Sequence, residues 1–555
     1  MGSVATRRLA RPAIFLSLIT ALVAGGIPPT GASAASGGSY SRVETGTAAP
    51  AVARAATRGS AARQEPKGAR HTPQVARAAA RSGQGNGGQD TSDSSSGKDS
   101  RALLRAFNGV SSLDSELTNF GLKFEPPDQG LCAGNGYVLE PVNSAYRIYR
   151  SNGTSIAGPF NVNDLFQHGG LQFTTDPRCY FDQTTNTWFA IILFISDNSD
   201  SSTLDISVNP SGDPTNGDWK FYHIDTTNAG GNGCPCFGDQ PRLGIDQSNL
   251  YVTTDEFSIL GTEFNGTQLY AFAKRDLVRQ RERVHFVHFH DLSVDGFLPV
   301  APQPALTTGS AAAEYMMGIL DPNGTGDNRL VVWAITNQDA VQRGGTPRLS
   351  SMVIASEPYA SPPQAIQPNG VLPLDSGDDR MQQTQFIGGS LWGELTSAVR
   401  VKGTKTTRAG AAWFKVRPRV SDGVLRGATV AQQGYVARSN RDIIYPALQA
   451  NASGSAAMVF TMTGADLYPS ASYATLDEGS DGFGRPQVGL AGTGNYFRRP
   501  TGEVLSNRWG DYSWAQLDPD GRSVWMATEY IPPKSSQTTN GFRNWGTAVL
   551  QVSLR

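Results

Sequence analysis

The sequence lacks the motifs that mark several common enzyme classes. It has no glycine loop that would cradle a phosphate, no Gly-x-Ser-x-Gly elbow and no His-Glu-x-x-His helix. It also lacks a long amphipathic helix. After residue 27 no apolar run reaches the roughly 20 residues that a membrane-spanning helix needs. We therefore expect a soluble mature chain without a transmembrane segment, and no bound cofactor.

Positive charge is scarce in the larger part of the chain. Residues 101–555 hold 35 Lys/Arg and 43 Asp/Glu, a net charge near −8, whereas the whole chain carries a formal charge of −1. Binding to nucleic acid needs a basic footprint. We therefore expect no nucleic-acid partner.

The N-terminal residues have the three parts of a secretory signal. Arg7, Arg8 and Arg11 form a positive region, residues 13–27 are apolar, and Ala32-Ser33-Ala34 offers small residues to a signal peptidase. This order predicts a signal peptide over residues 1–34 and a secreted protein, extracellular or attached to the cell surface.

Residues 35–100 are rich in Ala, Gly, Ser and Arg and contain almost no aromatic residue. Such a composition buries too little apolar surface to offset the entropy of ordering, which predicts a disordered, basic segment. Three interpretations remain open. The segment is a solvated linker, which we favour, a tether to an anionic cell-wall polymer, or a propeptide that is removed.

Cysteine is rare, and its four occurrences lie close together. An even number of cysteines in an exported protein favours disulfides over free thiols. We expect Cys132 to pair with Cys179, since both lie near the start of neighbouring repeats, and Cys234 to pair with Cys236 in a tight loop. A zinc site is a weaker alternative, because no second Cys pair or His pair has finger-like spacing.

From about residue 101, short β-branched and aromatic runs alternate with Gly, Asn, Asp and Pro turns, which predicts an all-β domain over residues 101–555. Similar units recur about every 65 residues, with Gly-Asp or Asp-Pro before an inner strand and an Asp turn before the next. We count seven starts, near residues 128, 176, 239, 314, 379, 442 and 511. This predicts a seven-bladed β-propeller, with residues 107–122 closing the ring. A six-bladed propeller, or a propeller with a β-sandwich, is the alternative.

Four stretches carry a resemblance to a known group: Pro126-Pro127-Asp128-Gln129-Gly130, Asp176-Pro177-Arg178, residues 234–241 and Arg508-Trp509-Gly510-Asp511-Tyr512. With these, residues 125–530 resemble secreted bacterial β-propeller proteins of largely unassigned function, and more distantly the sialidase type of propeller. The resemblance implies the fold and export. It implies no reaction, because a fold alone supplies none.

The repeat places acidic and basic side chains where inner strands begin, at the expected mouth of the axial channel. We predict that this ring binds a polar ligand, with Arg forks suited to a carboxylate or phosphate. The alternative is that these side chains only tie one blade to the next. The predicted ring consists of Asp176, Arg178, Asp239, Arg242, Asp379, Arg380, Asp442, Arg508 and Asp511.

A sialidase-like reaction is the enzymatic alternative. It needs three arginines on a sugar carboxylate, a Tyr nucleophile with a Glu, and an acid. The three arginines could be Arg178, Arg242 and Arg508. The nucleophile could be Tyr445 or Tyr512, with Glu529 as its partner. The Ser-x-Asp-x-Gly-x-Thr-Trp turn of sialidases is missing, however, and residues 211–219 only approach it.

Two further patterns suggest metal sites. His285, His288 and His290 lie in one expected strand beside Asp291, where zinc or copper ligands are one interpretation and an ordinary polar edge strand the favoured one. The loops 321–327 and 518–521 resemble calcium loops but lack the spaced ligands of an EF-hand. We expect hairpin turns there and no metal.

Taken together, the sequence favours a secreted, monomeric binding protein without catalysis, although an enzyme is not ruled out. The expected partner is an extracellular glycan, peptide or protein. The alternative is a sialidase-like or other glycan-active hydrolase whose site lies at the channel mouth.

Overall fold

The fold is described from a computed structural model. It covers residues 36–37, 40–51, 89–94, 101–230, 233–261, 263–320, 326–497 and 506–554, all within the unit Ala32–Arg555. The predicted signal peptide, most of segment 35–100 and most of loop 321–327 lie outside these residues. Strands make up 55% of the described residues and helices 6%, which confirms the all-β prediction. No helix in the described part is long and apolar enough to cross a membrane.

Four sheets have four strands each, and their order follows the chain except where β4 joins the last sheet. The first sheet contains β5 (Cys132–Gly134), β6 (Tyr137–Pro141), β7 (Ala145–Arg150) and β8 (Ser155–Asn161). The second contains β9 (Phe173–Asp182), β10 (Thr187–Ile195), β11 (Ser202–Asn209) and β12 (Lys220–Asp225). The third contains β26 (Asp442–Ala450), β27 (Ala456–Gly464), β28 (Leu467–Leu476) and β29 (Gln487–Leu490). The fourth contains β30 (Trp514–Leu517), β31 (Ser523–Tyr530), β32 (Gly546–Ser553) and β4 (Leu103–Ser111).

Two sheets are larger. A five-stranded sheet contains β1 (Ser36–Gly37), β17 (Val300–Pro304), β19 (Glu314–Ile319), β20 (Asp327–Thr336) and β21 (Arg348–Tyr359). An eleven-stranded sheet begins with β2 (Arg42–Ala48), β3 (Gln89–Thr91), β13 (Cys236–Ile245), β14 (Asn249–Ser258), β15 (Phe264–Ala273) and β16 (Val284–His290). It continues with β18 (Leu306–Thr307), β22 (Met381–Ile387), β23 (Ser390–Val401), β24 (Arg408–Ser421) and β25 (Val424–Val436).

Short helices connect the strands. They are α2 (Ser112–Thr118), α3 (Lys274–Val278) and the 3₁₀ turns η1 (Val162–Phe166), η2 (Gln338–Arg343), η3 (Pro368–Gly370) and η4 (Lys534–Ser536). Helix α2 begins with a capping box, because Ser111 and Asp114 satisfy each other's backbone N–H groups.

The prediction of seven blades is wrong, and so is the six-bladed alternative. The described residues form five sheets of blade size, with four or five strands each, and one continuous sheet of eleven strands. The cause is β18, which pairs in parallel with β13 on one side and with β22 on the other. This short extended segment satisfies the edges of both inner strands and so merges two units that the repeat suggested were separate.

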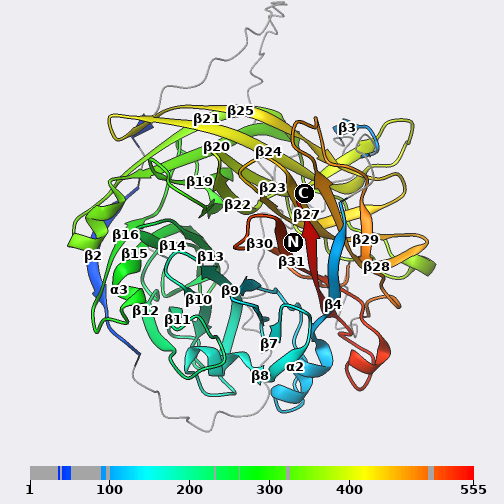
Figure 1. Ribbon diagram of the computed structural model, residues 1–555, viewed down its shortest axis with the longest axis horizontal. Helices are drawn as coiled ribbons and strands as arrows, with labels where there is room; N and C mark the ends of the chain where they lie inside the picture. The colour runs from blue at the N-terminus through cyan, green and yellow to red at the C-terminus, as the bar shows by residue number, and fades with distance from the viewer. Residues whose placement is uncertain are drawn as a thin grey trace, which may run out of the picture. The chain divides into compact units, whose positions relative to one another are not determined.

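The sheets are set around a common centre, which the inner strands β9, β13, β22 and β30 approach (Figure 1). The ring closes through the two ends of the domain, since β4 near its start pairs with β32 near its end. Of the predicted closing segment 107–122, residues 107–111 belong to this strand, whereas residues 112–118 form α2.

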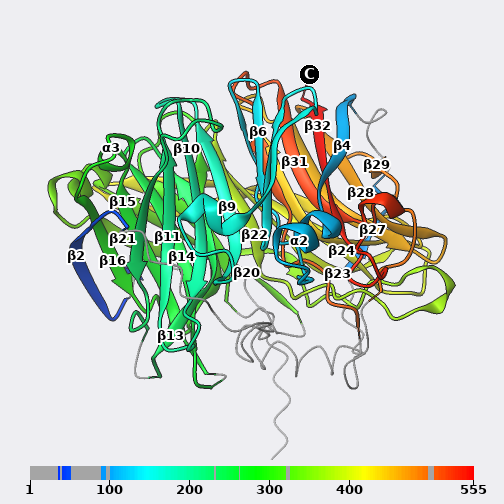
Figure 2. The ribbon, with the colours of Figure 1, turned by 90° about the horizontal axis from the view of Figure 1, so that it is seen from below.

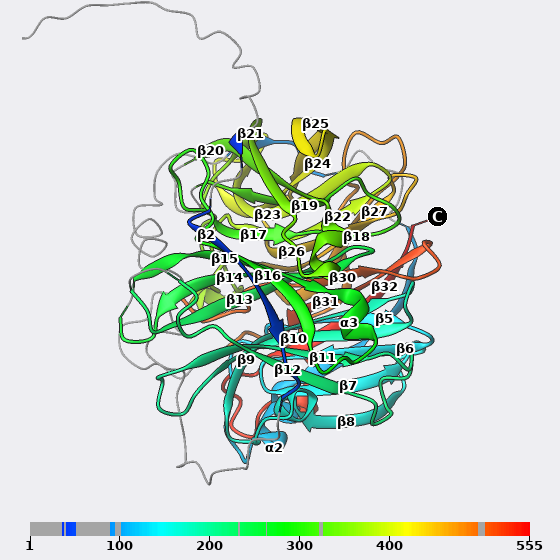
Figure 3. The ribbon, with the colours of Figure 1, turned by 90° about the vertical axis from the view of Figure 1, so that its left-hand side faces the viewer.

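Parts of segment 35–100 form strands that pair with strands of the ring. Strand β2 runs antiparallel to β16 over seven residue pairs, and Figures 2 and 3 show it lying along the outside of that strand. Strand β1 pairs with β21, and β3 pairs with β23. The composition of this segment does not indicate such pairing, because it depends on backbone hydrogen bonds rather than on apolar side chains.

Large aromatic side chains fill the space between sheets. The following tryptophans are less than 2% exposed or close to it: Trp188, Trp333, Trp392, Trp413, Trp509, Trp514, Trp525 and Trp545. Trp509 is fully buried and lies edge-on to Tyr496 with ring centroids 5.2 Å apart, so it has no face free to stack on a sugar.

Both predicted disulfides are present. Cys132 pairs with Cys179 and joins the first two sheets, while Cys234 pairs with Cys236. No cysteine is left free. The Cys132–Cys179 disulfide closes a loop of 47 residues and restrains the unfolded chain far more than the Cys234–Cys236 disulfide does.

Candidate functional site

Four inner strands carry the same irregularity. In each, a residue with left-handed backbone precedes a proline, and the strand pairing is disrupted there: Asp176 (φ 60°) in β9, Gln240 (φ 46°) in β13, Ala301 (φ 54°) in β17 and Tyr445 (φ 51°) in β26. Proline inside a sheet occurs at edges, at strand ends or at such bulges, and a bulge re-aims the neighbouring side chains. Each left-handed non-glycine residue costs about 1–3 kcal/mol, and strain of this kind gathers at functional sites.

Four carboxyl groups influence one another at the start of the inner strands. We call Asp128, Asp176, Asp239 and Asp511 the central carboxylate cluster. The backbone N–H of Asp511 donates to Oδ1 of Asp128 at 2.7 Å. Asn143 links Asp128 to Asp176. Its Nδ2 donates to Asp128 Oδ2 at 2.8 Å, and its Oδ1 accepts from the backbone N–H of Asp176 at 2.7 Å.

The members of the central carboxylate cluster titrate differently. Burial, followed by repulsion from neighbouring carboxylates, raises the pKa of Asp128 and Asp176 well above the ordinary value. Burial and then Asp511 raise the pKa of Asp239, which is partly exposed, to about 7. For Asp511 burial acts in the same sense, but the Arg508 guanidinium outweighs it and lowers the pKa. A carboxyl that holds its proton near neutral pH therefore adjoins one that stays ionised.

Three of the predicted arginines are already paired with carboxylates. Arg508 Nη2 lies 2.6 Å from Asp511, Arg242 Nη2 lies 2.8 Å from Asp255, and Arg380 Nη2 lies 2.6 Å from Asp378. The Arg242–Asp255 pair is completely enclosed, with each side chain 1% exposed. The Arg508–Asp511 pair is more open, at 23% and 18%.

The side chain of Gln240 joins these pairs. Its Oε1 accepts from Arg242 at 3.2 Å and from Arg380 at 3.0 Å, while its Nε2 donates to Asp511 at 3.3 Å. This orientation of the amide is the one that serves all three partners. Gln240 thus ties β13 to the central carboxylate cluster from its position in the bulge.

Arg178 has a different environment. Its guanidinium carbon lies 3.2 Å from the centroid of the Tyr512 ring and 5.0 Å from that of Trp514, so it is held by aromatic faces. Its Nε and one terminal nitrogen have no hydrogen-bond partner, and burial lowers its pKa. Since the residue is only 2% exposed, it does not present an open fork to solvent.

Some predicted members lie apart from the cluster. Asp442 is fully buried and accepts hydrogen bonds from Arg408 at 3.1 Å and from the N–H of Ala409 at 3.0 Å, which is an ordinary tie between strands. Asp379 is also fully buried, and its charge acts on Tyr359. The structure therefore unites Asp176, Arg178, Asp239, Arg242, Arg380, Arg508 and Asp511, and it places Asp442 elsewhere.

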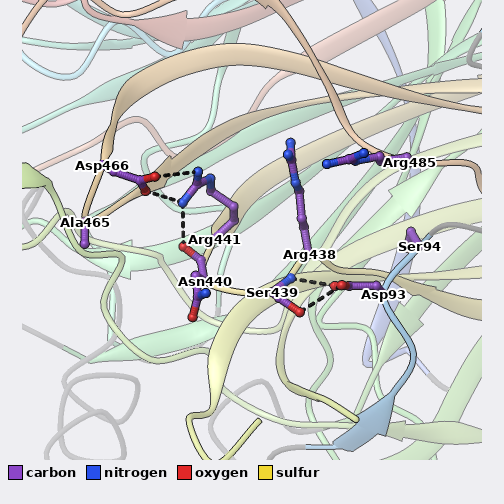
Figure 4. A pocket seen from close by; sticks show the side chains of 9 residues that line it. All are labelled: Asp93, Ser94, Arg438, Ser439, Asn440, Arg441, Ala465, Asp466 and Arg485. Atoms are coloured by element: carbon purple, nitrogen blue, oxygen red, sulfur yellow. Dashed lines mark hydrogen bonds and ion pairs between the residues drawn. The ribbon is translucent and has the colours of Figure 1, made fainter. Parts of the chain in front are cut away.

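A separate cavity of about 610 Å³ lies next to Arg441. Arg441 pairs there with Asp466, and the side chains of Arg438 and Arg485 lie near each other on another wall (Figure 4). Asp93 from segment 35–100 completes this wall by accepting from Ser439 Oγ at 2.8 Å. The cavity shares no lining residue with the central carboxylate cluster.

The sequence did not identify four members of the site: Asp128, Gln240, Asp255 and Asp378. Asp128 lies in the motif that carries the family resemblance, and Gln240 stands between two predicted residues. The position of each in the sequence could therefore have indicated a role in the site. Nothing in the sequence indicated Asp255 or Asp378, because their role depends on which arginine the fold brings to them.

The groups of the sialidase alternative are present but engaged. Glu529 accepts from the N–H of Gly510 at 2.7 Å, and Tyr445 Oη is buried without a hydrogen-bond partner. Arg242 and Arg508 have carboxylate partners, and Arg178 is covered by Tyr512. No set of three free guanidiniums faces a common point among these residues.

No family model matches the chain, and no curated protein matches it. Among solved structures it is similar to the Penicillium chrysogenum α-L-arabinanase complexed with arabinobiose (10% identity, 81% of this chain and 99% of that chain, TM-score 0.33). It is also similar to the Trypanosoma rangeli sialidase (11%, 76% and 59%, 0.33) and to Drosophila Semaphorin 1b (9%, 82% and 88%, 0.31). Likeness at this level indicates no activity for the chain.

Proposed function

We propose that the central carboxylate cluster is a hydrolytic site that acts on a neutral glycan, with Asp239 as the general acid. The observation that carries this proposal is the division of pKa values within the cluster. Asp239 has a pKa of about 7 and is partly exposed, whereas its neighbour Asp511 is kept ionised by Arg508. Two carboxyl groups whose environments push their pKa values apart are the usual pattern of an acid and its charged partner in glycoside hydrolysis.

The charge balance supports a neutral substrate. Arg242, Arg380 and Arg508 are each neutralised by an aspartate, while Asp176 and Asp239 have no arginine bound to them among the described contacts. An anionic sugar would meet no free guanidinium fork, because these three arginines are engaged and Arg178 is covered by Tyr512. We therefore favour neutral glycosides over sialosides, which revises the substrate of the enzymatic alternative.

The remaining expectations enter as part of the proposal. The two disulfides accord with an oxidising compartment, so we place the protein outside the cell. The second candidate function is binding of a glycan without turnover. The strained bulges support both functions, because each needs side chains aimed at the ring centre.

The experiment compares Asp239→Asn with the unaltered protein on a panel of fluorogenic neutral glycosides and sialosides at pH 6. We expect release from a neutral glycoside, with a rate lower by about 10²–10⁴ in Asp239→Asn because proton donation is lost. Asp466→Asn is the matched control, since this aspartate is 74% exposed and pairs only at the surface. It should keep the full rate.

Two results would contradict the proposal. Release that persists in a folded Asp239→Asn variant would remove this residue from the reaction. Binding of a glycan without release by any protein of the set would favour the second candidate function.

A further inference from the structure

Three side chains from two paired strands meet on the outside of the ring, away from the site proposed above. Glu44 lies in β2 directly opposite His288 of β16, and His290 follows two residues later on the same face of that strand. One ligand atom from each of the three lies within 4.8 Å of the others. His290 Nε2 lies 3.3 Å from a carboxylate oxygen of Glu44.

The hydrogen bonds of the two imidazoles indicate which nitrogen carries the proton. His290 Nδ1 lies 3.1 Å from the carbonyl oxygen of Ala229, which only accepts, so this contact favours a proton on Nδ1 and a lone pair on Nε2. His288 Nε2 donates to Gln268 Oε1 at 3.0 Å, which leaves the lone pair on Nδ1. Gln268 is held in this orientation because its Nε2 donates to Asp291 at 3.0 Å. Such outer partners are typical of histidines that bind metals.

A cation already occupies the open side of this group. Arg42 Nη2 lies 3.3 Å from His290 Nε2 and 3.4 Å from His290 Nδ1, and Arg42 Nε lies 2.9 Å from Glu44. The guanidinium thus lies against the imidazole and the carboxylate that a metal ion would use. Because the Arg42 side chain is 59% exposed, it can turn into solvent without breaking the core.

The two rings are held in place by their neighbours. His288 and His290 are 6% and 4% exposed, their ring centroids lie 3.6 Å apart, and His288 stacks on Tyr270 at 4.1 Å.

We propose that Glu44, His288 and His290 form a binding site for a divalent transition metal, zinc in the first instance, and that the metal fastens β2 to β16. Two imidazole nitrogens and one carboxylate oxygen are a known ligand set for zinc and leave a fourth position for water. The side chains of β2 are mostly exposed, so this strand has few apolar contacts of its own. A metal would therefore add the strongest side-chain link between segment 35–100 and the ring.

The test is equilibrium binding of Zn²⁺ to the full chain after treatment with a chelator, followed by titration against a chromophoric competitor. We expect one tight site, at least 100-fold weaker in His290→Asn and about 10–100-fold weaker in Gln268→Ala, which removes an outer partner. Arg42→Ala should bind Zn²⁺ more tightly than the unaltered protein. His285→Asn is the matched control on the same strand, because His285 pairs with Asp276 outside the cluster.

A second readout reports on β2 itself. At Zn²⁺ 100-fold above its dissociation constant, detachment of β2 should become about 100-fold rarer, and hydrogen exchange of the amides in Arg42–Ala48 should slow accordingly. Equal affinity in folded His290→Asn and His285→Asn would overturn the proposal. So would Zn²⁺ binding that is lost only in His168→Asn, because His168, Asp205 and His223 form another group with the required spacing.

Discussion

Replacing Arg242 by methionine should lower the free energy of unfolding by about 3–5 kcal/mol, although methionine fills a similar volume. Arg242 and Asp255 are each 1% exposed, and their atoms lie 2.8 Å apart. The substitution leaves the Asp255 carboxylate buried with only Thr267 at 2.7 Å and a weaker backbone donor. Chemical denaturation measures this change as a lower midpoint, provided that the dependence of the unfolding free energy on denaturant concentration stays the same.

Two variants control this result. Arg242→Met with Asp255→Asn removes both charges and should recover most of the lost stability, because a buried pair is costly to break but not to replace. Arg441→Met breaks a pair whose aspartate is 74% exposed and should cost no more than about 1 kcal/mol. If Arg242→Met were as mild as Arg441→Met, the buried pair would not hold the inner strands, and Arg242 would be free to bind a ligand.

Stability should fall as the pH rises from 5 to 8.5. Burial raises the pKa of Glu140 to about 7 and that of Glu256 to about 8, and both side chains are fully buried. Between the unfolded pKa near 4.5 and these values, the folded chain holds protons that the unfolded chain has released. Raising the pH from 5 to 8.5 removes those protons, at a cost of about 3 kcal/mol for Glu140 and about 4 kcal/mol for Glu256, at 1.4 kcal/mol per pK unit.

Thermal unfolding followed across this pH range measures the slope. Glu140→Gln and Glu256→Gln mimic the protonated side chains, so each variant should flatten the curve and be more stable than the unaltered protein at pH 8.5. Glu116→Gln should not flatten it, because the pKa of Glu116 is lowered. Equal stability at pH 5 and 8.5 would mean that these carboxyls are hydrated or paired at neutral pH.

The sequence identified the features that depend on local pattern. Alternation of strands and turns indicated an all-β chain, and closeness to neighbouring repeats indicated the Cys132–Cys179 bridge. Asp176, Asp239 and Asp511 were found because each belongs to a recurring dipeptide at the start of an inner strand. Their convergence follows from the ring, which brings the starts of those strands together.

The features that the sequence missed depend on contacts between distant segments. The number of separate sheets differs from the prediction because β18 joins two of the expected units. This strand is only two residues long, so it has no periodicity that a sequence pattern could reveal. Strand β2 reads as a polar linker, yet it pairs with β16 through backbone groups and supplies Glu44 opposite His288. In the same way, the partners Asp255 and Asp378 decide whether an arginine is free, and no local pattern distinguishes them from surface aspartates.

The measurement that tests the central proposal most directly is a titration of Asp239 in the folded protein. Carboxyl ¹³C resonances of labelled aspartate would be followed from pH 3 to 9, and the signal absent from Asp239→Asn would be assigned to this side chain. We predict a midpoint near pH 7 for that signal. In the Asp511→Asn variant, which keeps Arg508, the midpoint should shift to lower pH, because Asp511 raises the pKa of Asp239. A midpoint near 4, the ordinary value for aspartate, would contradict the account, since Asp239 would then hold no proton to donate at neutral pH.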